Sequence, residues 1–268
     1  LTHEAVPQTP FTLAGQSFPE PSPFDRRILE KQVRYVGDEV AIVAADDEET
    51  ALKALRLIKV DYETLTPVFS LDEAIDNPNL VHEKEPFTNF DIGMDAKRNI
   101  AASQVVEFGD VEKELAASEV VIEKTYTTQA QAHGMMETYR ATTCFDVNGR
   151  LQVTSSTQVP YHIRRHLSRI LDLPKSKIKV LKPRVGGGFG GKQTASVEIF
   201  PALVTVLTGK PAKIVYSRQE TFSSTTSRHA MKLTVRLGAD KEGNINAVDI
   251  HCLSDTGAYG EHAPTVFW

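Results

Sequence analysis

The chain has 268 residues, of which 41% are hydrophobic and 24% are charged, and its formal net charge is −5. That length can bury a sizeable core in one large or two smaller domains, and the composition excludes a disordered chain. The mixed, slightly acidic charge excludes a basic surface for nucleic acid, and no apolar run reaches the roughly 20 residues that a membrane-spanning helix needs.

Cys144 and Cys252 are the two cysteines of the chain. They lie far apart and form no C-x-x-C pair, so they predict neither an iron–sulfur cluster nor a disulfide framework. This cysteine usage is typical of a reducing compartment and favours a cytoplasmic location. The chain starts at Leu1 rather than methionine and stops at Trp268 after a strand-like run, so we interpret both ends as cuts.

The N-terminal part of the chain predicts an irregular segment followed by one β-α-β unit. Residues 1–24 are rich in proline, which fixes φ and removes an N–H donor. Residues 40–45 form an apolar run of strand length, and an Asp-Asp pair then caps a helix with apolar residues at helical spacing. Residues 60–63 predict a returning strand, and residues 70–75 predict a second short helix.

Residues 76–104 are polar and interrupted by proline and glycine, so they predict a linker to a second domain. In that domain, caps, turn residues and periodicity predict the following elements in order: a helix over 110–117, a strand over 120–128, a hairpin over 142–154 with Asn148-Gly149 at its turn, a helix over 160–171, a strand over 177–181, a helix over 194–207 that Pro201 kinks or splits, a strand over 212–216, and a hairpin over 231–253.

The segment with the most chemical content is RVGGGFGGK at 184–192, between a predicted strand and a predicted helix. Glycine fills five of the six positions from 186 to 191, which costs backbone entropy. A chain tolerates this cost where backbone N–H groups must approach a ligand closely. A flexible loop is the alternative, but a turn between a strand and a helix aims its amides outward, which favours a binding role.

Two nucleotide-binding patterns partly match this turn. Gly186, Gly188 and Gly191 fit G-x-G-x-x-G, but that fingerprint needs an acidic residue near the end of the next strand, where only Glu220 is close. The same segment approaches the phosphate-binding pattern G-x-x-x-x-G-K-[ST], but Gln193 stands where a hydroxyl must bind Mg²⁺. A nucleotide-binding protein therefore stays open as an alternative function.

Three polar residues outside the turn also attract a functional interpretation. His162 and His166 lie four positions apart on a predicted helix and could bind zinc, but no H-E-x-x-H motif is present. The arginines around them favour a solvated or interface face. Glu137 in HGMMET could hold the residues of a site in place without contacting the ligand, although a structural carboxylate satisfied by hydrogen bonds is the preferred interpretation.

Several motifs, taken in order, resemble the xanthine dehydrogenase/aldehyde oxidase family. Members carry a glycine-rich turn G-G-x-F-G-x-K, and residues 186–192 read GGGFGGK. Thr157-Gln158 is similar to the family's T-Q dipeptide, and HGMMETYRA at 133–141 is similar to its H-x-x-x-E segment. Residues 36–75 resemble its hammerhead domain, and DTGAYG at 255–260 is another similar stretch. The ordered set covers most of the chain and is far more specific than any one motif.

The resemblance implies an α+β fold of two incomplete domains. Residues 1–90 would form an a/b hammerhead domain truncated at its N-terminus. Residues 91–268 would form the first molybdenum-cofactor-binding α/β subdomain, truncated at its C-terminus. The family's catalytic base is a glutamate late in the full subunit, so no catalytic residue is assigned in this chain. The isolated chain is accordingly expected to bind no molybdenum and to be inactive.

The resemblance assigns cofactor contacts to Gln158 and to the glycine turn. Gln158 would hydrogen-bond the oxo ligand of molybdenum, and the backbone N–H of Phe189 would contact the metal's oxygen ligand. Gly187, Gly188 and Gly190 would let the cofactor approach the backbone. A plainer interpretation of Gln158 is a cap for the helix that follows it.

Gln193 stands where xanthine-oxidising members carry a glutamate that engages the purine, and it would face the substrate. Because glutamine cannot carry a negative charge, a purine is in doubt, and another heteroaromatic compound or an aldehyde is favoured.

The implied reaction is oxidative hydroxylation of this small-molecule substrate on molybdenum–molybdopterin, with water as the oxygen source. The implied partners are the rest of the molybdenum subunit and the 2Fe-2S and FAD centres of other domains or subunits, without nucleic acid or membrane. A non-catalytic module that keeps the fold is a further alternative.

Overall fold

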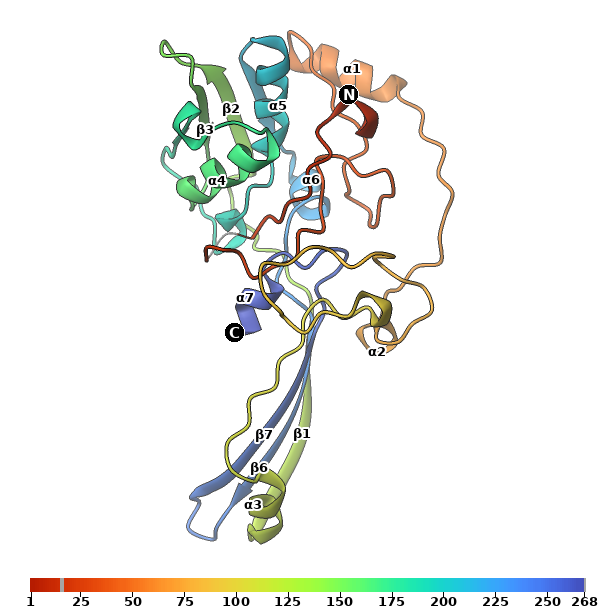
Figure 1. The fold of residues 1–268 in the computed structure, drawn as a ribbon, viewed down its shortest axis with the longest axis vertical. Helices are drawn as coiled ribbons and strands as arrows, with labels where there is room; N and C mark the ends of the chain where they lie inside the picture. The colour runs from red at the N-terminus through yellow and green to blue at the C-terminus, as the bar shows by residue number, and fades with distance from the viewer. Residues whose placement is uncertain (15–16, 268) are drawn as a thin grey trace.

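A computed structural model describes residues 1–14 and 17–267 of the chain. They form an upper body and a long arm that projects from it (Figure 1). The helices are α1 (Glu48–Leu57), α2 (Leu71–Ala74), α3 (Val111–Ala117), α4 (Pro160–Ile170), α5 (Ile199–Thr208), α6 (Arg218–Ser223) and α7 (Ala263–Phe267). The strands are β1 (Val120–Thr128), β2 (Arg140–Phe145), β3 (Leu151–Ser155), β4 (Ile178–Leu181), β5 (Ala212–Val215), β6 (Met231–Ala239) and β7 (Ile245–Ser254).

A four-stranded sheet of order β4-β3-β2-β5 forms the centre of the body. The pairs β2–β3 and β2–β5 are antiparallel, whereas β3 and β4 are parallel and joined by α4. Helix α4 packs on β4, and α5 packs on β2 and β5, so the core lies between these helices and the sheet. Val153 of β3, Leu167 of α4 and Leu203 of α5 are at most 2% exposed in that core. The α+β fold predicted from the sequence is confirmed.

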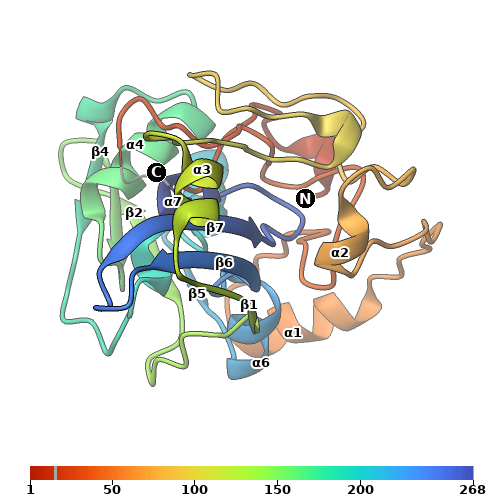
Figure 2. The same ribbon diagram turned by 90° about the horizontal axis from the view of Figure 1, so that it is seen from below.

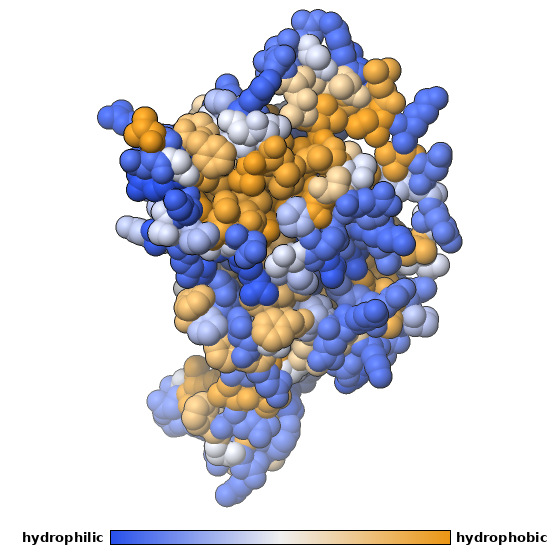
Figure 3. Space-filling view, turned by 45° about the horizontal axis from the view of Figure 1, so that its top comes forward, coloured by the Kyte–Doolittle hydropathy of each residue, from blue (hydrophilic) through white to orange (hydrophobic). Residues whose placement is uncertain are grey.

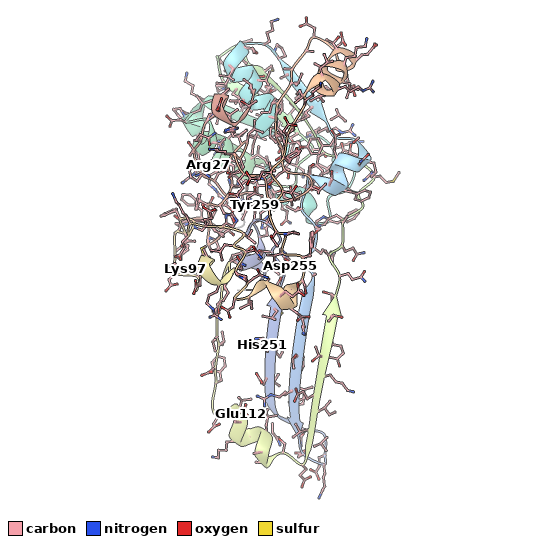
Figure 4. The ribbon with its side chains drawn as sticks, turned by 90° about the vertical axis from the view of Figure 1, so that its right-hand side faces the viewer. Arg27, Lys97, Glu112, His251, Asp255 and Tyr259 are labelled. Atoms are coloured by element: carbon pink, nitrogen blue, oxygen red, sulfur yellow. The ribbon has the colours of Figure 1, made fainter. Side chains whose placement is uncertain are left out.

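The arm is a three-stranded antiparallel sheet of order β1-β6-β7. All nine residues of β1 are exposed, and β1 pairs with β6 along its whole length, from Val120 opposite Ala239 to Thr128 opposite Met231. Helix α3 packs against β6 and β7 near the far end of the arm. Figure 4 shows Glu112 of α3 at that end, Asp255 where the arm meets the body, and Tyr259 within the body above it.

The DTGAYG motif that follows β7 is fastened to the N-terminal segment by a polar network. The Arg26 guanidinium, 8% exposed, bonds Glu39 and Glu261 at 3.0 Å each. The Tyr259 hydroxyl lies 3.0 Å from a carboxylate oxygen of Asp38. The ion pairs of a buried arginine with two carboxylates are costly to break, so this network holds two distant stretches of the chain together.

The N-terminal region corrects part of the sequence prediction. Helix α1 is present, and the Asp47 side chain accepts from the backbone N–H of Thr50 at 2.7 Å, as an N-terminal cap should. The strands predicted over 40–45 and 60–63 are wrong: both stretches lack strand pairing. A strand needs a partner row of backbone groups, and the described residues offer only Leu1, which exchanges two bonds with Ile42.

The apolar stripe of α1 remains uncovered. Leu52, Leu55 and Ile58 are 41 to 47% exposed. Figure 2 shows α1 and α2 on the opposite side of the molecule from β4 and α4, and hydrophobic residues gather on the surface of the upper body in Figure 3. No helix in the described part of the chain is both long enough and apolar enough to cross a membrane.

Helix α5 begins later than predicted. Residues 194–198 do not join it, and its first residue is Ile199 instead of Thr194. Pro201 therefore lies in the first turn, where its missing N–H has no intrahelical partner to lose, so the expected kink or split is wrong. Gly209, with φ 72°, closes the helix as predicted.

Candidate functional site

The glycine turn and Gln158 lie at one edge of the body sheet. Gln158 follows β3, and the turn follows β4, the parallel neighbour that α4 connects to it. The carboxyl ends of parallel strands meet at one edge, which is where ligands of open sheets gather. The backbone N–H of Gln158 donates to the carbonyl of Lys192 at 2.9 Å. The predicted closeness of these two segments, more than 30 positions apart in the chain, is therefore confirmed.

The side chain of Gln158 is fixed against the turn. Its Oε1 accepts the backbone N–H of Gly190 at 3.1 Å and that of Lys192 at 3.3 Å. The interpretation of Gln158 as a helix cap is wrong, because α4 begins after Val159 with no side-chain cap. Since Oε1 is used twice, the amide orientation is set, and Nε2 has no partner among the described residues. Gln158 thus keeps an N–H donor for a ligand.

The turn itself depends on glycine at defined positions. A Cβ on Gly188 would lie 2.3 Å from Oε1 of Gln158, so only glycine permits this close approach. Gly190 has φ 93° and is followed by the short 3-10 helix Gly191–Gln193. Phe189 has φ 49°, which is uncommon for a bulky residue, and its side chain is 67% exposed. Residues held in such sparsely populated conformations cluster at ligand-binding and active sites.

Over residues 186–191, three backbone N–H groups are bonded within the chain, so the predicted set of ligand-facing amides is reduced to the other three. The N–H of Gly186 donates to Glu137, and that of Gly191 to the carbonyl of Gly188. Within the described ranges, the consecutive amides of 187, 188 and 189 have no hydrogen-bond partner. Successive free amides around a left-handed residue suit an anion or an oxygen ligand. That they share one open concavity stays a prediction.

Lys192 excludes the phosphate-loop alternative. Its side chain is 1% exposed, and Nζ lies 3.1 Å from Oε2 of Glu137 and 2.8 Å from Oγ of Ser156. A phosphate-binding lysine must instead reach out of the loop to the ligand. Burial lowers the pKa of Lys192, while the hydrogen bond that it donates to Glu137 opposes that shift.

The dinucleotide alternative fails at Glu220. This carboxylate accepts the backbone N–H of Ser217 at 2.6 Å, while the Ser217 hydroxyl accepts that of Glu220, so both residues form the capping box of α6. No acidic side chain near the end of β5 is then left for a ribose in the described part of the molecule. Both nucleotide-binding interpretations are therefore contradicted by the geometry.

Glu137 is the structural carboxylate that the sequence favoured. Its Oε2 accepts from Ser156 Oγ at 2.5 Å, from Gly186 N at 2.6 Å and from Lys192 Nζ at 3.1 Å. Burial raises the pKa of Glu137, but these hydrogen bonds outweigh it and hold the pKa below its usual value. The sequence did not single out Ser156 or the inward direction of Lys192. The sequence shows a lysine directly after the glycines and a glutamate far upstream, but nothing in it indicates that the two side chains pair.

The sequence predicts a solvated or interface face for the two histidines of α4, and this is wrong for His166, which is buried within the chain. His166 is 3% exposed, and burial, followed by Arg165 and His162, lowers its pKa to about 3. His162 is half-buried. Within the described ranges, no group of three or more histidine, cysteine, aspartate and glutamate side chains could hold a metal ion. Gln193 ends the short 3-10 helix after the turn, and its role toward a substrate stays a prediction.

Comparison with known proteins places these features in one family. The molybdopterin cofactor-binding domain family matches residues 93–268, and the a/b hammerhead domain of aldehyde oxidase and xanthine dehydrogenase matches residues 1–66. A probable hypoxanthine oxidase of Escherichia coli O157:H7, XdhD, is 42% identical over 99% of this chain and 30% of its own length. The nicotinate dehydrogenase large molybdopterin subunit of Eubacterium barkeri is 34% identical over 89% of this chain and 53% of its own length.

Structural similarity agrees with these matches. The aldehyde oxidoreductase of Desulfovibrio desulfuricans superposes with a TM-score of 0.80 at 25% identity, covering 94% of this chain and 27% of that enzyme. The chain belongs to the xanthine dehydrogenase/aldehyde oxidase family of molybdenum hydroxylases, a class of oxidoreductases. It corresponds to hammerhead and molybdopterin-binding segments of the molybdenum subunit, and it spans about 30% of the length of the first curated relatives it matches.

Proposed function

We propose that this chain supplies one side of the cofactor pocket in a molybdenum hydroxylase that hydroxylates a heteroaromatic compound or an aldehyde, with water as the oxygen source. One observation carries the proposal. The side chain of Gln158 is held by two amides of the glycine turn, so its remaining N–H donor and the free amides of 187–189 belong to one rigid unit.

The donor set fits the molybdenum–molybdopterin group. Oxygen ligands on a metal and the phosphate of a pterin accept hydrogen bonds, and the turn offers N–H donors whose direction is set before any ligand arrives. When bound, the group supplies the two-electron redox chemistry. The residues of this chain then bind and orient it: Gln158 and Phe189 donate, and Gly188 leaves the space for the Gln158 side chain.

The proton acceptor of the reaction does not come from the described carboxylates beside the turn. Glu137 is engaged by three donors, and Glu198 is 2% exposed with its pKa raised by burial. The proposal therefore assigns that acceptor to a glutamate outside these 268 residues. It likewise assigns electron transfer to 2Fe-2S and FAD centres on other domains or subunits. The boundary that we propose between the two domains of this chain lies at residue 90.

The substrate class rests on two supports. Relatives carry names that refer to hypoxanthine, nicotinate and aldehydes, which are heteroaromatic compounds or aldehydes. Gln193 follows the turn and carries no charge, so it can hydrogen-bond a neutral ring atom or carbonyl but cannot pair with a cationic one. Within the proposed class, a substrate without a positive charge is therefore preferred.

Substitution of Gln158 in the full-length protein tests the proposal. We expect Gln158→Ala to lower kcat about ten- to hundredfold with a small change in the unfolding temperature, because it removes a donor and no core packing. The matched control is Gln152→Ala, which changes a half-buried glutamine of β3 away from the turn. Steady-state kinetics, molybdenum and pterin content and thermal unfolding are measured together. Full-length wild-type protein without molybdenum or pterin would support a non-catalytic module instead.

A further inference from the structure

The glycine turn is held at both ends by one carboxylate oxygen. Oε2 of Glu137 accepts the backbone N–H of Gly186, where the turn begins, and the ammonium of Lys192, where it ends. The same oxygen accepts the hydroxyl of Ser156, which in turn accepts from Lys192. Ser156 lies two residues before Gln158, so the turn and the Gln158 segment share one polar centre.

Further hydrogen bonds join the same three segments. Glu137 N donates to the carbonyl of Gly186 at 3.2 Å, and Tyr139 Oη donates to the carbonyl of Gly191 at 2.6 Å. Thr157 Oγ1 donates to the carbonyl of Lys192 at 3.3 Å. The anchoring thus falls at residues 186 and 190–192, while the positions between them carry the free amides.

The strained residue of the turn is held by backbone hydrogen bonds on either side of it and not by its ring. Phe189 is in the left-handed region and is mostly exposed, so packing of its ring does not hold its backbone in place. The Gly191 N–H donates to the carbonyl of Gly188 and closes the turn around Phe189, and the anchors at 186 and 190–192 hold that turn in place. Loss of either anchor would let the turn relax toward a conformation that a phenylalanine prefers.

Stability alone does not explain a buried ammonium at this place. Removing a lysine and a glutamate from water is costly, and an uncharged pair of similar size often stabilises a protein as well or better. A buried ion pair does, however, fix distance and direction between the groups that carry it. The charged atoms of Glu137 and Lys192 bond one another and Ser156, and the second carboxylate oxygen of Glu137 lies 3.5 Å from Nε of Arg140, so both side chains are already engaged within the chain.

We propose that Glu137 and Lys192 are positioning residues, whose ion pair sets the span of the glycine turn and thereby aims the free amides of 187–189 and the Gln158 donor at the cofactor. This inference rests on the proposed function and adds residues that act without touching the cofactor. Ser156 is the third member of this hydrogen-bonded group, since it links the ion pair to the segment that carries Gln158.

The decisive test is the double variant Glu137→Gln/Lys192→Met in the full-length enzyme. It replaces the ion pair by uncharged groups of similar size, so the fold should survive with an unfolding temperature close to that of the wild type. We expect cofactor content to be retained and kcat to fall about ten- to hundredfold, with KM changed less than kcat, because a displacement of about 1 Å in a positioning group has effects of this size. The electron paramagnetic resonance signal of the reduced molybdenum centre should shift as well.

A second measurement does not depend on turnover. Hydrogen exchange in cofactor-free full-length protein should show faster exchange of the Gly190 and Lys192 amides in the double variant, with α5 unchanged. The single variant Glu137→Gln, which keeps hydrogen-bonding capacity, should show the same effects more weakly. The control Lys232→Met removes an ion pair with Asp72 near the arm and should leave cofactor content, kcat, the resonance signal and amide exchange of the turn unchanged.

The outcomes separate this inference from the proposed function. Wild-type protein without molybdenum or hydroxylase turnover would overturn the proposed function. An active wild type whose double variant keeps its kcat, its resonance signal and its amide protection would overturn the positioning role alone. If the double variant does not fold, unchanged exchange and kcat in Glu137→Gln would overturn the positioning role in its place.

Discussion

The glycine turn and the β1-β6-β7 arm hold their backbones in opposite ways. The turn is fixed by side chains from distant segments, among them Glu137, Ser156 and Gln158. The arm is fixed by a ladder between strands adjacent in space, and all nine residues of β1 are exposed. Tertiary contacts therefore determine the shape of the turn, whereas local pairing determines the shape of the arm.

This difference has consequences for stability. Regions with buried contacts open only with the whole fold, whereas regions with exposed backbone bonds and few buried contacts open locally at lower free energy. The body that carries the turn belongs to the first kind, because Leu151, Val153 and Leu167 are at most 1% exposed. The arm belongs to the second kind within these 268 residues. A rigid turn on a rigid body suits a site that must hold donors in fixed directions.

The largest effect expected is from truncation in the body. Leu167→Ala should lower the free energy of unfolding by about 2–5 kcal/mol, because it leaves a cavity between α4 and the sheet. The matched arm variant Val121→Ala, at a position 52% exposed, should cost at most about 1 kcal/mol. Urea unfolding and hydrogen exchange of the two regions measure the difference. Equal losses of unfolding free energy would show that other parts of the full-length protein cover the arm. The arm would then not be less stable than the body.

An intermediate effect is expected from a buried histidine. Burial lowers the pKa of His166 to about 3, whereas an unfolded histidine titrates near 6.5. Between these values the unfolded chain binds a proton that the folded chain does not, so stability is complete above about pH 6.5 and falls as the pH decreases toward 3.

Replacement of that histidine checks the sign. When the pH falls from 7 to 5, the free energy of unfolding should decrease by about 2 kcal/mol less in His166→Leu than in the wild type. The reason is that the wild type loses about 1.4 kcal/mol for each of the roughly 1.5 pH units between 6.5 and 5. His251→Gln, on an exposed position of β7, serves as the control and should follow the wild type. Parallel pH profiles for His166→Leu and wild type would mean that His166 is hydrated in solution.

The sequence predicted those parts of the fold that local patterns determine. The turn Asn148-Gly149, the cap at Asp47 and the glycine at 209 each specify a boundary by their own conformational preference, and the structure has each of them. The meeting of Gln158 with the turn was also predictable, because strand–helix–strand connectivity brings two strand ends to one edge.

The misses depend on partners that local patterns do not reveal. The apolar run at 40–45 and the alternating stretch VDYE at 60–63 form strands only if another strand pairs with them. The inward direction of Lys192 was hidden, because a lysine after glycines looks the same in a phosphate loop as in a buried ion pair. Only the position of Glu137 in three dimensions separates these two meanings.

The smallest effect is expected from the charge network at the end of the arm. Arg236 of β6 bonds Glu112 of α3 and Asp249 of β7, and these pairs connect the helix to both strands. The three side chains are 30 to 69% exposed, so solvent and salt screen the attraction. Arg236→Met should therefore lower the free energy of unfolding only slightly, and about 1 M salt should remove most of the difference from the wild type. Hydrogen exchange of α3 and β6 should report the loss, since the global unfolding transition follows the body. If the amides of residues 186–192 exchange faster in the same variant, the arm and the turn are coupled. It would then be wrong that the arm is stabilised by local pairing independently of the turn.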